Sequence, residues 1–404
     1  MNIPAAYIYM QHPITAETVT LGRLSGGRNG RGEFVYSPAY LAQNDWVPDP
    51  IRYPVGDQVF QVTTNNGIPG FIRDCMPDSW GEQLLKSLHG QAMSPVEMLI
   101  RSPNNDRIGN LMAGIARVPP PGVGGEQIPS LQGLSEFIDT ADIIQSRQLI
   151  DPDRQKILLV RHRSSLGGAR PKRTLRDGNT LVLAKARDRF DIVDIPAIEH
   201  ACMTFATSKG IDTARTRLIA DERSTLLVDR FDRVEIDGRM HRIPMLSALT
   251  LLDADWSSTD HSRWRYAGVA DEMRRRGVPL KDLEQFYIQM CFHVLVGNDD
   301  AHAKNLAIIW RDGTWRLSPM YDVVPSPLES PATMAMALGK EGKRISRRNI
   351  LSHHQHFGLD LLSAEALLDK VLGWESELRE HYARHLTGED HAAAVNAISS
   401  SRVI

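Results

Sequence analysis

Short apolar runs separated by turn residues dominate the first part of the chain, and this pattern predicts β-strands. Residues 18–24 and 33–36 are rich in strand-forming side chains, and the glycines within positions 26–30 predict a turn that joins them. One helix is predicted at residues 78–90, where Gly90 marks its end. The N-terminal region is therefore predicted to be rich in β-structure.

The middle of the chain continues the strand pattern around a glycine-rich segment. A helix is predicted over residues 195–209, and the turn residues 236–239 predict a further hairpin. We name residues 164–172 (SSLGGARPK) the Gly-rich loop, because they separate two predicted strands. The strands predicted in this part are residues 157–160, 180–187, 215–220 and 224–229.

In the C-terminal part the apolar positions recur at helical spacing instead. A long helix is predicted over residues 283–296, with Asp282 as its cap and Gln285 at the third helical position. A second helix, opened by Ser363, is predicted over residues 364–386. A β-rich half followed by a helical half predicts an α+β protein with two lobes and a cleft between them.

Residues 119–125 (PPPGVGG) form the clearest break in the chain. Three prolines and three glycines within seven residues exclude a regular element. A chain of 404 residues is also too long for one ordinary core. We therefore predict an N-terminal subdomain at 1–118, a β-rich lobe with the Gly-rich loop at 119–244, and a helical lobe at 245–404.

Composition narrows the class of protein without indicating a function. Apolar residues make up 42% of the sequence, and the net charge of −2 gives no global attraction to nucleic acid or anionic membranes. The three cysteines have no pairing or metal-ligand spacing, so we expect reduced thiols. Neither a secretory signal nor a run of roughly 20 apolar residues is present. We expect a cytoplasmic protein that does not bind membranes.

A candidate for chemistry follows the long predicted helix. Asp300 and Asn305 lie on a predicted loop, and residues 306–310 and 315–317 predict a hairpin that ends shortly before Asp322. Because the two ends of a hairpin lie close together, we expect Asp300, Asn305 and Asp322 to converge on one point. Their carboxylate and amide oxygens are suited to Mg²⁺, which takes one or two protein ligands together with phosphate oxygens and water.

This spacing is the one that phosphoryl transfer by kinases uses. We predict that Asp300 accepts the proton of an attacking hydroxyl, and that Asn305 and Asp322 hold the metal. Lys304 lies beside the base, where its charge would stabilise the transferred group. The competing interpretation is that these side chains only cap and turn a hairpin.

Several neighbouring residues leave the assignment of roles open. Asp299 is an alternative base, although the spacing to Asn305 favours Asp300. His302 is either structural or in contact with the site. A metal site at His353, His354 and His356 is an alternative that a polar helix start explains at least as well.

The Gly-rich loop is the candidate for the nucleotide end of the site. Its small residues let backbone N–H groups approach phosphate, and Arg170 and Lys172 add positive charge. Lys185 lies on an apolar strand and is expected to meet phosphate or Glu199, unless it is only an edge lysine. Residues 226–232 form a strand end of the kind that leads to an adenine-binding hinge.

Five segments in this order resemble the HipA family of serine/threonine kinase toxins from bacterial toxin–antitoxin systems. They read SSLGGARPK, LVLAKAR, LVDRFDR, GNDDAHAKN and LSPMYDV. The segments GRLSGGRNGRGEFVY, MPDSWGEQLL and NNDRIGNLMAGI extend the resemblance over nearly the whole chain. The resemblance implies a protein-kinase-like fold that uses ATP and Mg²⁺.

The same resemblance implies roles for further residues. Lys185 would contact the ATP phosphates, and Asp229 and Phe231 would lie at the adenine hinge. Ser165 corresponds to a serine whose autophosphorylation switches the enzyme off, in keeping with the charge that a phosphate would add beside bound ATP. The residues predicted to bind ATP are Ser165, Gly167, Gly168, Ala169, Arg170, Lys172, Lys185, Asp229, Phe231, His302, Asn305 and Asp322.

The family also implies partners. Its members phosphorylate glutamyl-tRNA synthetase or a related aminoacyl-tRNA synthetase and thereby arrest growth, and a small helix-turn-helix antitoxin (HipB-like) neutralises them. Operator DNA is then expected to be bound only through the antitoxin complex. Two alternatives remain: a small-molecule phosphotransferase with the same base and metal ligands, and a nucleotide-dependent binding module that acts as a repressor partner.

Overall fold

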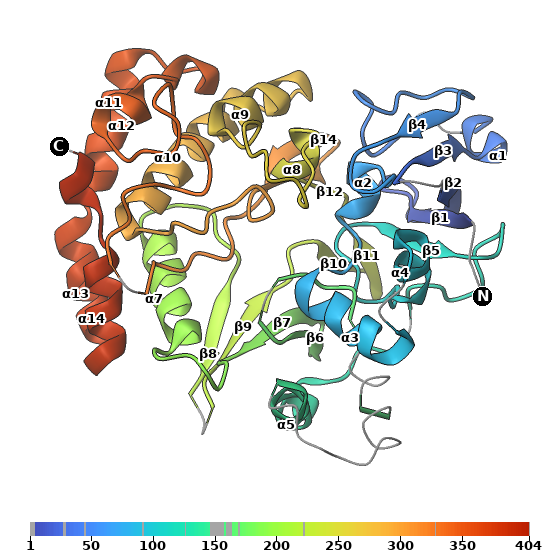
Figure 1. Cartoon of the computed structure of the whole chain (residues 1–404), viewed down its shortest axis with the longest axis horizontal. Coiled ribbons are helices and arrows are strands. Elements are labelled where there is room, and N and C mark those ends of the chain that lie inside the picture. The colour runs from blue at the N-terminus through green and yellow to red at the C-terminus, as the bar shows by residue number, and fades with distance from the viewer. Residues whose placement is uncertain are drawn as a thin grey trace. The chain divides into compact units, whose positions relative to one another are not determined.

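The chain divides into two compact units that are not continuous in sequence. The computed structural model describes residues 5–26, 30–43, 46–90, 93–125, 127–145, 157–158, 164–168, 170–220, 223–327 and 329–403 (Figure 1). Unit 1 comprises residues 1–186, 230–246 and 255–257, and unit 2 comprises residues 187–229, 247–254 and 258–404. The predicted division into three parts at residues 118 and 244 stays a prediction.

Unit 1 contains a five-stranded antiparallel sheet in the order β4-β3-β2-β1-β5. Gly22 of β2 lies opposite Tyr36 of β3, and a Cβ at Gly22 would collide with the carbonyl oxygen of Val35. The predicted pairing of residues 18–24 with 33–36 is therefore confirmed. The strands are β1 (Ala5–Gln11), β2 (Thr18–Gly26), β3 (Gly32–Tyr36), β4 (Phe60–Val62) and β5 (Leu111–Gly114).

Short helices complete the N-terminal part of unit 1. The predicted helix at residues 78–90 is confirmed as α3, with Asp78 at its N-cap and Gly90 at its C-cap. Its apolar face buries Trp80 and Leu84 against Ala141 of α5. The helices are α1 (Pro38–Leu41), α2 (Gly70–Arg73), α3 (Ser79–His89), α4 (Pro95–Arg101), the 3₁₀ turn η1 (Leu131–Gly133) and α5 (Leu134–Gln145). Residues 119–125 form turns without a helix or strand, as predicted.

Unit 1 also contains two β-hairpins. β6 (Lys172–Asp177) pairs with β7 (Thr180–Ala186), and β10 (Arg233–Ile236) pairs with β11 (Arg239–Arg242). The strand predicted at residues 157–160 is wrong where the structure describes it, because residues 157 and 158 are helical. A short apolar run does not by itself distinguish a strand from a helix.

Unit 2 is mostly helical and also contains two β-hairpins. β8 (Thr216–Ile219) pairs with β9 (Thr225–Asp229), and β13 (Ala307–Arg311) pairs with β14 (Thr314–Leu317), as predicted. Figure 1 shows α7 beside α13 and α14, with which it packs. The helices are α7 (Ile195–Ser208), α8 (Ala248–Leu251), α9 (Tyr266–Arg275), α10 (Leu280–Val296), α11 (Arg347–Leu351), α12 (Leu361–Leu372), α13 (Glu375–His385) and α14 (Gly388–Ala397).

Two details of the helix predictions are wrong. α10 begins at Leu280 after Pro279, so Asp282 lies in the first turn instead of capping it, and its carboxylate binds Arg316. The helix predicted over residues 364–386 is two helices, α12 and α13, which meet at Gly373. The cap of α12 is Asp360, which accepts a hydrogen bond from the Ser363 backbone N–H at 2.7 Å.

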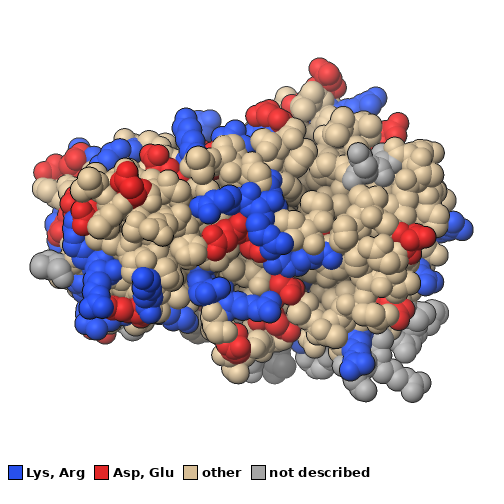
Figure 2. Space-filling view, turned by 90° about the horizontal axis from the view of Figure 1, so that it is seen from above, with Lys and Arg blue, Asp and Glu red and all other residues tan. Residues whose placement is uncertain are grey.

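A β-rich first half and a helical second half confirm the predicted α+β class. Among the residues that the structure describes, no helix combines the length and the apolar character needed to cross a bilayer. The face in Figure 2 carries basic and acidic side chains close to one another, in keeping with the net charge of −2.

Candidate active site

The loop that carries Asp300 begins at a fixed point, because Gly297 ends α10 in a left-handed conformation with φ of 68°. A Cβ at this position would collide with the backbone carbonyl of Ala397. Asn298 then folds back onto the helix: its backbone N–H donates to the carbonyl of His293 at 2.9 Å, and its side-chain amide lies 3.0 Å from Nδ1 of His293. The start of the loop is thus held by both backbone and side-chain contacts.

Residues 300–305 alternate between a buried and an open side. Ala301 and Ala303 are fully buried, and the carbonyl of Ala303 accepts a hydrogen bond from the Leu249 backbone N–H at 3.0 Å. The side chain of Asp300, just before these anchors, is 81% exposed, and that of His302, between them, is 19% exposed. The buried alanines therefore hold the loop while Asp300 faces solvent, whereas Asn305 is buried.

The hairpin β13–β14 brings the second half of the site back to this loop. The hydroxyl of Tyr321 donates a hydrogen bond to the backbone carbonyl of Lys304 at 2.8 Å. Asp322 follows directly and has a φ of 59°, a conformation that is uncommon outside glycine and often marks functional positions. Backbone hydrogen bonds between Met320 and the Asp212–Ala214 segment hold the strand end in place.

Asp300, His302 and Asp322 lie close enough within unit 2 that their charges shift the pKa of Asp300 and that of His302. Partial burial raises the pKa of Asp300, His302 lowers it, and the negative charges of Asp322 and Asp299 raise it further, so that it lies above its ordinary value. Burial lowers the pKa of His302, which favours a neutral imidazole near neutral pH, although Asp300 and Asp322 oppose this. Nε2 of His302 lies 4.0 Å from Oδ1 of Asp300.

Asn305 and Asp322 have the chemistry that Mg²⁺ requires. The side-chain amide nitrogen of Asn305 donates to the backbone carbonyl of Asp300 at 3.4 Å, which orients its amide group. The side-chain oxygen of Asn305 and the carboxylate of Asp322 are hard oxygen ligands. The negative charge of Asp322 also raises the pKa of Asp300, and a bound cation would reduce this electrostatic repulsion. Within the described ranges no set of three or more His, Cys, Asp or Glu side chains is arranged to hold a metal ion.

The residues predicted to bind nucleotide lie in both units. The Gly-rich loop, Lys185 and Phe231 belong to unit 1, whereas Asp229 and the loop at residues 300–305 belong to unit 2. Lys172, the last residue of the loop and the first of β6, pairs with Lys185 of β7, which brings two basic residues to neighbouring positions of the hairpin. Ala169 lies outside the described residues.

Ser165 occupies an unusual position in the Gly-rich loop. Its side chain is 1% exposed, and its hydroxyl oxygen has no hydrogen-bond partner among the residues that the structure describes. Most buried hydroxyl groups are hydrogen-bonded, so an unpaired one needs an explanation. In this conformation the hydroxyl is closed off from any acceptor or donor in solvent.

Three residues at or near these segments were not predicted to have a role. Tyr321 joins the two halves of the loop site, and the carboxylates of Asp78 and Asp106 accept hydrogen bonds from the Gly-rich loop. All three occur inside segments that resemble the family, but their contacts depend on tertiary structure. No local spacing distinguishes them from ordinary turn or cap residues.

Comparisons with known proteins agree with this organisation. Residues 164–378, slightly more than half of the chain, match the family model described as HipA-like C-terminal domain. A curated protein of Sinorhizobium fredii (strain NBRC 101917 / NGR234), named "Putative kinase Y4mE", is 26% identical over 349 residues, which cover 79% of each chain. The solved structure of HipA from Shewanella oneidensis MR-1, in complex with HipB and operator DNA, is similar with a TM-score of 0.71 at 18% identity. That match covers 98% of this chain and 95% of the Shewanella chain, and it confirms the predicted fold.

Proposed function

Because this chain belongs to the HipA family, we propose that it is an ATP- and Mg²⁺-dependent kinase that phosphorylates serine or threonine in a protein. The observation that carries the proposal is the loop site of unit 2. There Asp300 is open to solvent, and the hydrogen bond from Tyr321 to Lys304 brings Asp322 next to it. The name of the Sinorhizobium relative, which includes the word kinase, supports the same class of reaction.

Asp300 acts as the base in this proposal. Its carboxylate accepts the proton of the acceptor hydroxyl while the hydroxyl oxygen bonds to the γ-phosphorus and the bond to the ADP oxygen breaks. The raised pKa of Asp300 makes the carboxylate a stronger base than an ordinary aspartate. Bound Mg²⁺ would neutralise charge on the phosphate oxygens, and Asn305 and Asp322 are the residues that would hold it.

Lys304 and His302 take supporting roles in the same loop. The ammonium group of Lys304 stabilises negative charge that spreads over the transferred phosphoryl group. Burial lowers the pKa of His302, which favours the neutral imidazole beside Asp300, with Nε2 4.0 Å from Oδ1 of that carboxylate. In unit 1, backbone N–H groups of Gly167 and Gly168 with Arg170, Lys172 and Lys185 bind the phosphates. Asp229 and Phe231 contact the adenine end.

The finer part of the proposal concerns targets and partners. We infer that the enzyme arrests growth by phosphorylating a translation factor, with an aminoacyl-tRNA synthetase as the first candidate, and that Ser165 is its autophosphorylation site. A helix-turn-helix antitoxin is the proposed partner, supported by the likeness to a HipA solved with HipB and operator DNA. Operator DNA would then be bound only when that partner is present.

The test uses the full chain with labelled ATP and a cell lysate. We expect label on one or a few protein bands with the wild-type chain, and no label with Asp300→Asn. Asp312→Asn is the matched control, because Asp312 lies in the β13–β14 turn and has a φ of 52° that asparagine also adopts. Label that appears only on small molecules would identify a small-molecule phosphotransferase instead. Equal labelling by Asp300→Asn and wild type would refute the mechanism.

A further inference from the structure

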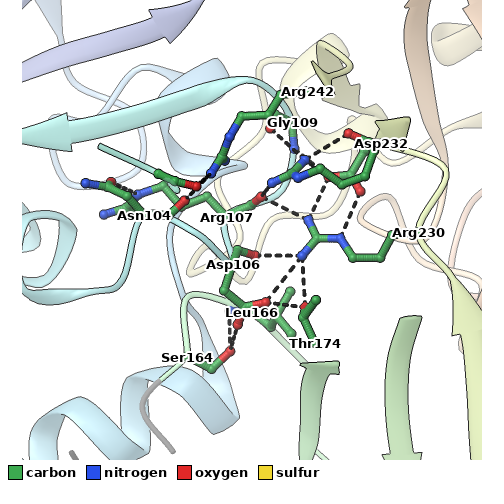
Figure 3. A network of polar contacts seen from close by, with 12 residues as sticks. Asn104, Asp106, Arg107, Gly109, Ser164, Leu166, Thr174, Arg230, Asp232 and Arg242 are labelled. Atoms are coloured by element: carbon green, nitrogen blue, oxygen red, sulfur yellow. Dashed lines mark hydrogen bonds and ion pairs between the residues drawn. The ribbon is translucent and has the colours of Figure 1, made fainter. Parts of the chain in front are cut away.

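The Gly-rich loop is held at both ends by carboxylates from the N-terminal part of unit 1. At the first residue of the loop, the hydroxyl of Ser164 donates to Oδ2 of Asp106. Behind it, the hydroxyl of Thr174 in β6 donates to Oδ1 of the same carboxylate. The carboxylate of Asp106 therefore joins the start of the loop, at Ser164, to the segment that follows the loop, at Thr174, as Figure 3 shows.

Asp106 is itself fixed by a buried guanidinium group. Arg230 donates to the backbone carbonyl of Asp106 at 3.0 Å, to its Oδ1 at 3.3 Å and to Oγ1 of Thr174 at 2.9 Å. The other nitrogen atoms of Arg230 bind Asp232 at 2.9 and 2.7 Å. Burial alone would lower the pKa of Arg230, but Asp232 and Asp106 raise it above its ordinary value. The cation that holds Asp106 therefore stays charged.

A second carboxylate binds the loop at its glycines. Oδ1 of Asp78 accepts a hydrogen bond from the Gly168 backbone N–H at 2.5 Å, and the Trp80 backbone N–H donates to the Gly168 carbonyl at 3.1 Å. At Gly81 a Cβ would approach the carbonyl oxygens of Leu166 and Ser164 at 2.5 and 2.9 Å. The start of α3 is thus in close contact with residues 164–168 over their whole length.

These contacts surround Ser165, whose hydroxyl has no hydrogen-bond partner among the described residues. Ser165 lies between Ser164 and Leu166, all three are buried, and the Leu166 backbone N–H donates to Oγ of Ser164 at 3.0 Å. Ser165 can reach solvent only if the bonds at one or both ends of the loop break. Gly168 likewise cannot offer its N–H to a phosphate while Asp78 holds it.

We propose that Asp106 and Asp78 are positioning residues that lock residues 164–168 in place, and that release of this lock controls both exposure of Ser165 and phosphate binding by Gly168. Asp106 fixes the stem of the loop, so its loss frees Ser165. Asp78 occupies the anion position on Gly168, so ATP must displace it. The consequence for ATP rests on the proposed function, whereas the lock itself does not.

The lock is tested by thiol labelling of Ser165→Cys in the full chain without nucleotide. The three native cysteines, Cys75, Cys202 and Cys291, are all buried, so they contribute a low background. We expect slow labelling of Ser165→Cys alone, and labelling about tenfold faster or more when Asp106→Asn is added, because a hydrogen bond to a charged group is lost. Because no kinase step is involved, this measurement succeeds or fails independently of the proposed function.

Two further variants separate loss of the lock from general unfolding. Asp49→Asn changes another fully buried carboxylate of unit 1 and should leave the labelling rate of Ser165→Cys within about twofold. Thr174→Val removes only one donor to Asp106, so it tests the lock in a chain that keeps the carboxylate. Unchanged labelling of Ser165→Cys in both Asp106→Asn and Thr174→Val would overturn the proposal. An equal rise in the labelling of Cys75 would also overturn it.

The role of Asp78 is tested by a separate measurement, the KM for ATP. In Asp78→Asn the neutral side chain holds the Gly168 N–H less tightly, so ATP should bind more tightly while the rate of transfer from bound ATP stays close to wild type. The expected result is a fall in the KM for ATP of about threefold or more with little change in kcat. A raised KM would show that Asp78 supports phosphate binding instead of competing with it, and would overturn this half of the proposal.

Discussion

The hydroxyl of Tyr321 donates a hydrogen bond to the backbone carbonyl of Lys304 at 2.8 Å, and this bond joins two segments that are 17 residues apart in sequence. One segment carries Asn305 and the other carries Asp322. Because the β13–β14 hairpin lies between them, small changes in the hairpin would otherwise alter the separation of the two proposed metal ligands. Tyr321 thus sets the geometry of the site without having to contact a substrate.

Replacing Tyr321 by phenylalanine should weaken metal use more than stability. The lost hydrogen bond is worth about 1 kcal/mol, so the free energy of unfolding should fall by no more than that amount. The Mg²⁺ concentration needed for half-maximal activity should rise several-fold, about 5–10-fold for a misplaced ligand. Titration of kinase activity with Mg²⁺ checks this. Tyr287→Phe is the control, because it removes another buried hydroxyl of unit 2, one that donates to the Ala364 carbonyl at 3.4 Å.

The acid side of the pH profile should report Asp300. Its pKa is raised by partial burial and by the charges of Asp322 and Asp299, so activity should fall at a higher pH than for an ordinary aspartate base. Asp299→Asn removes one of these negative charges. The pKa of Asp300 then falls, and the acid limb of kcat/KM moves to lower pH while the plateau is retained. A loss of more than about 100-fold on the plateau would instead identify Asp299 as the base.

Gly297 and Gly313 form a natural pair for measuring how tightly the loop is anchored. Both have a positive φ, 68° and 77°, so alanine should cost about 1 kcal/mol of unfolding free energy at either position. At Gly313 nothing lies within 4 Å of an added Cβ, whereas at Gly297 the Cβ would collide with Ala397. We expect Gly297→Ala to cost about 2 kcal/mol more than Gly313→Ala in urea unfolding. Equal losses of unfolding free energy would mean that the segment around Ala397 moves aside for the added Cβ at little cost.

Asp282 should contribute far more to stability than its position in a helix suggests. Its carboxylate accepts hydrogen bonds from Nε and Nη2 of Arg316, each at 2.8 Å, and from the Leu317 backbone N–H at 2.9 Å. We expect Asp282→Asn to lower the free energy of unfolding by about 1–3 kcal/mol. Asp369→Asn breaks a similar two-bond contact, with Arg347, but Asp369 is 58% exposed, so the loss there should be below about 1 kcal/mol.

Local patterns predicted most of the regular elements, and the failures have physical reasons. The β13–β14 hairpin was predictable because Asp312 and Gly313 form its turn, with φ of 52° and 77°. β6 was not predicted, because its sequence KRTLRD is mostly polar and its strand conformation depends on pairing with β7. The break at Gly373 was missed because helical spacing continues through it.

The candidate site was predictable in its residue types but not in its supports. Asp300, Asn305 and Asp322 are identified by spacing and by the intervening hairpin, both of which are local properties. Tyr321 and Asp106 act through contacts with residues 17 and 58 positions away, and no periodicity in the sequence reports such contacts. The role of Asp300 as base and the roles of Asn305 and Asp322 as metal ligands stay predictions, which the substitutions above test.

The buried arginines of unit 1 have a consequence for how the chain can be divided. The match to the HipA-like C-terminal domain begins at residue 164, yet Arg230 and Arg233 donate to backbone carbonyls of Asp106, Arg107 and Gly109, which precede that boundary. A fragment that starts at residue 164 would lack these backbone acceptors and the packing around them, so it should be less stable than the full chain. The start of the match to the family model is therefore not a boundary of folding, because hydrogen bonds within unit 1 cross it.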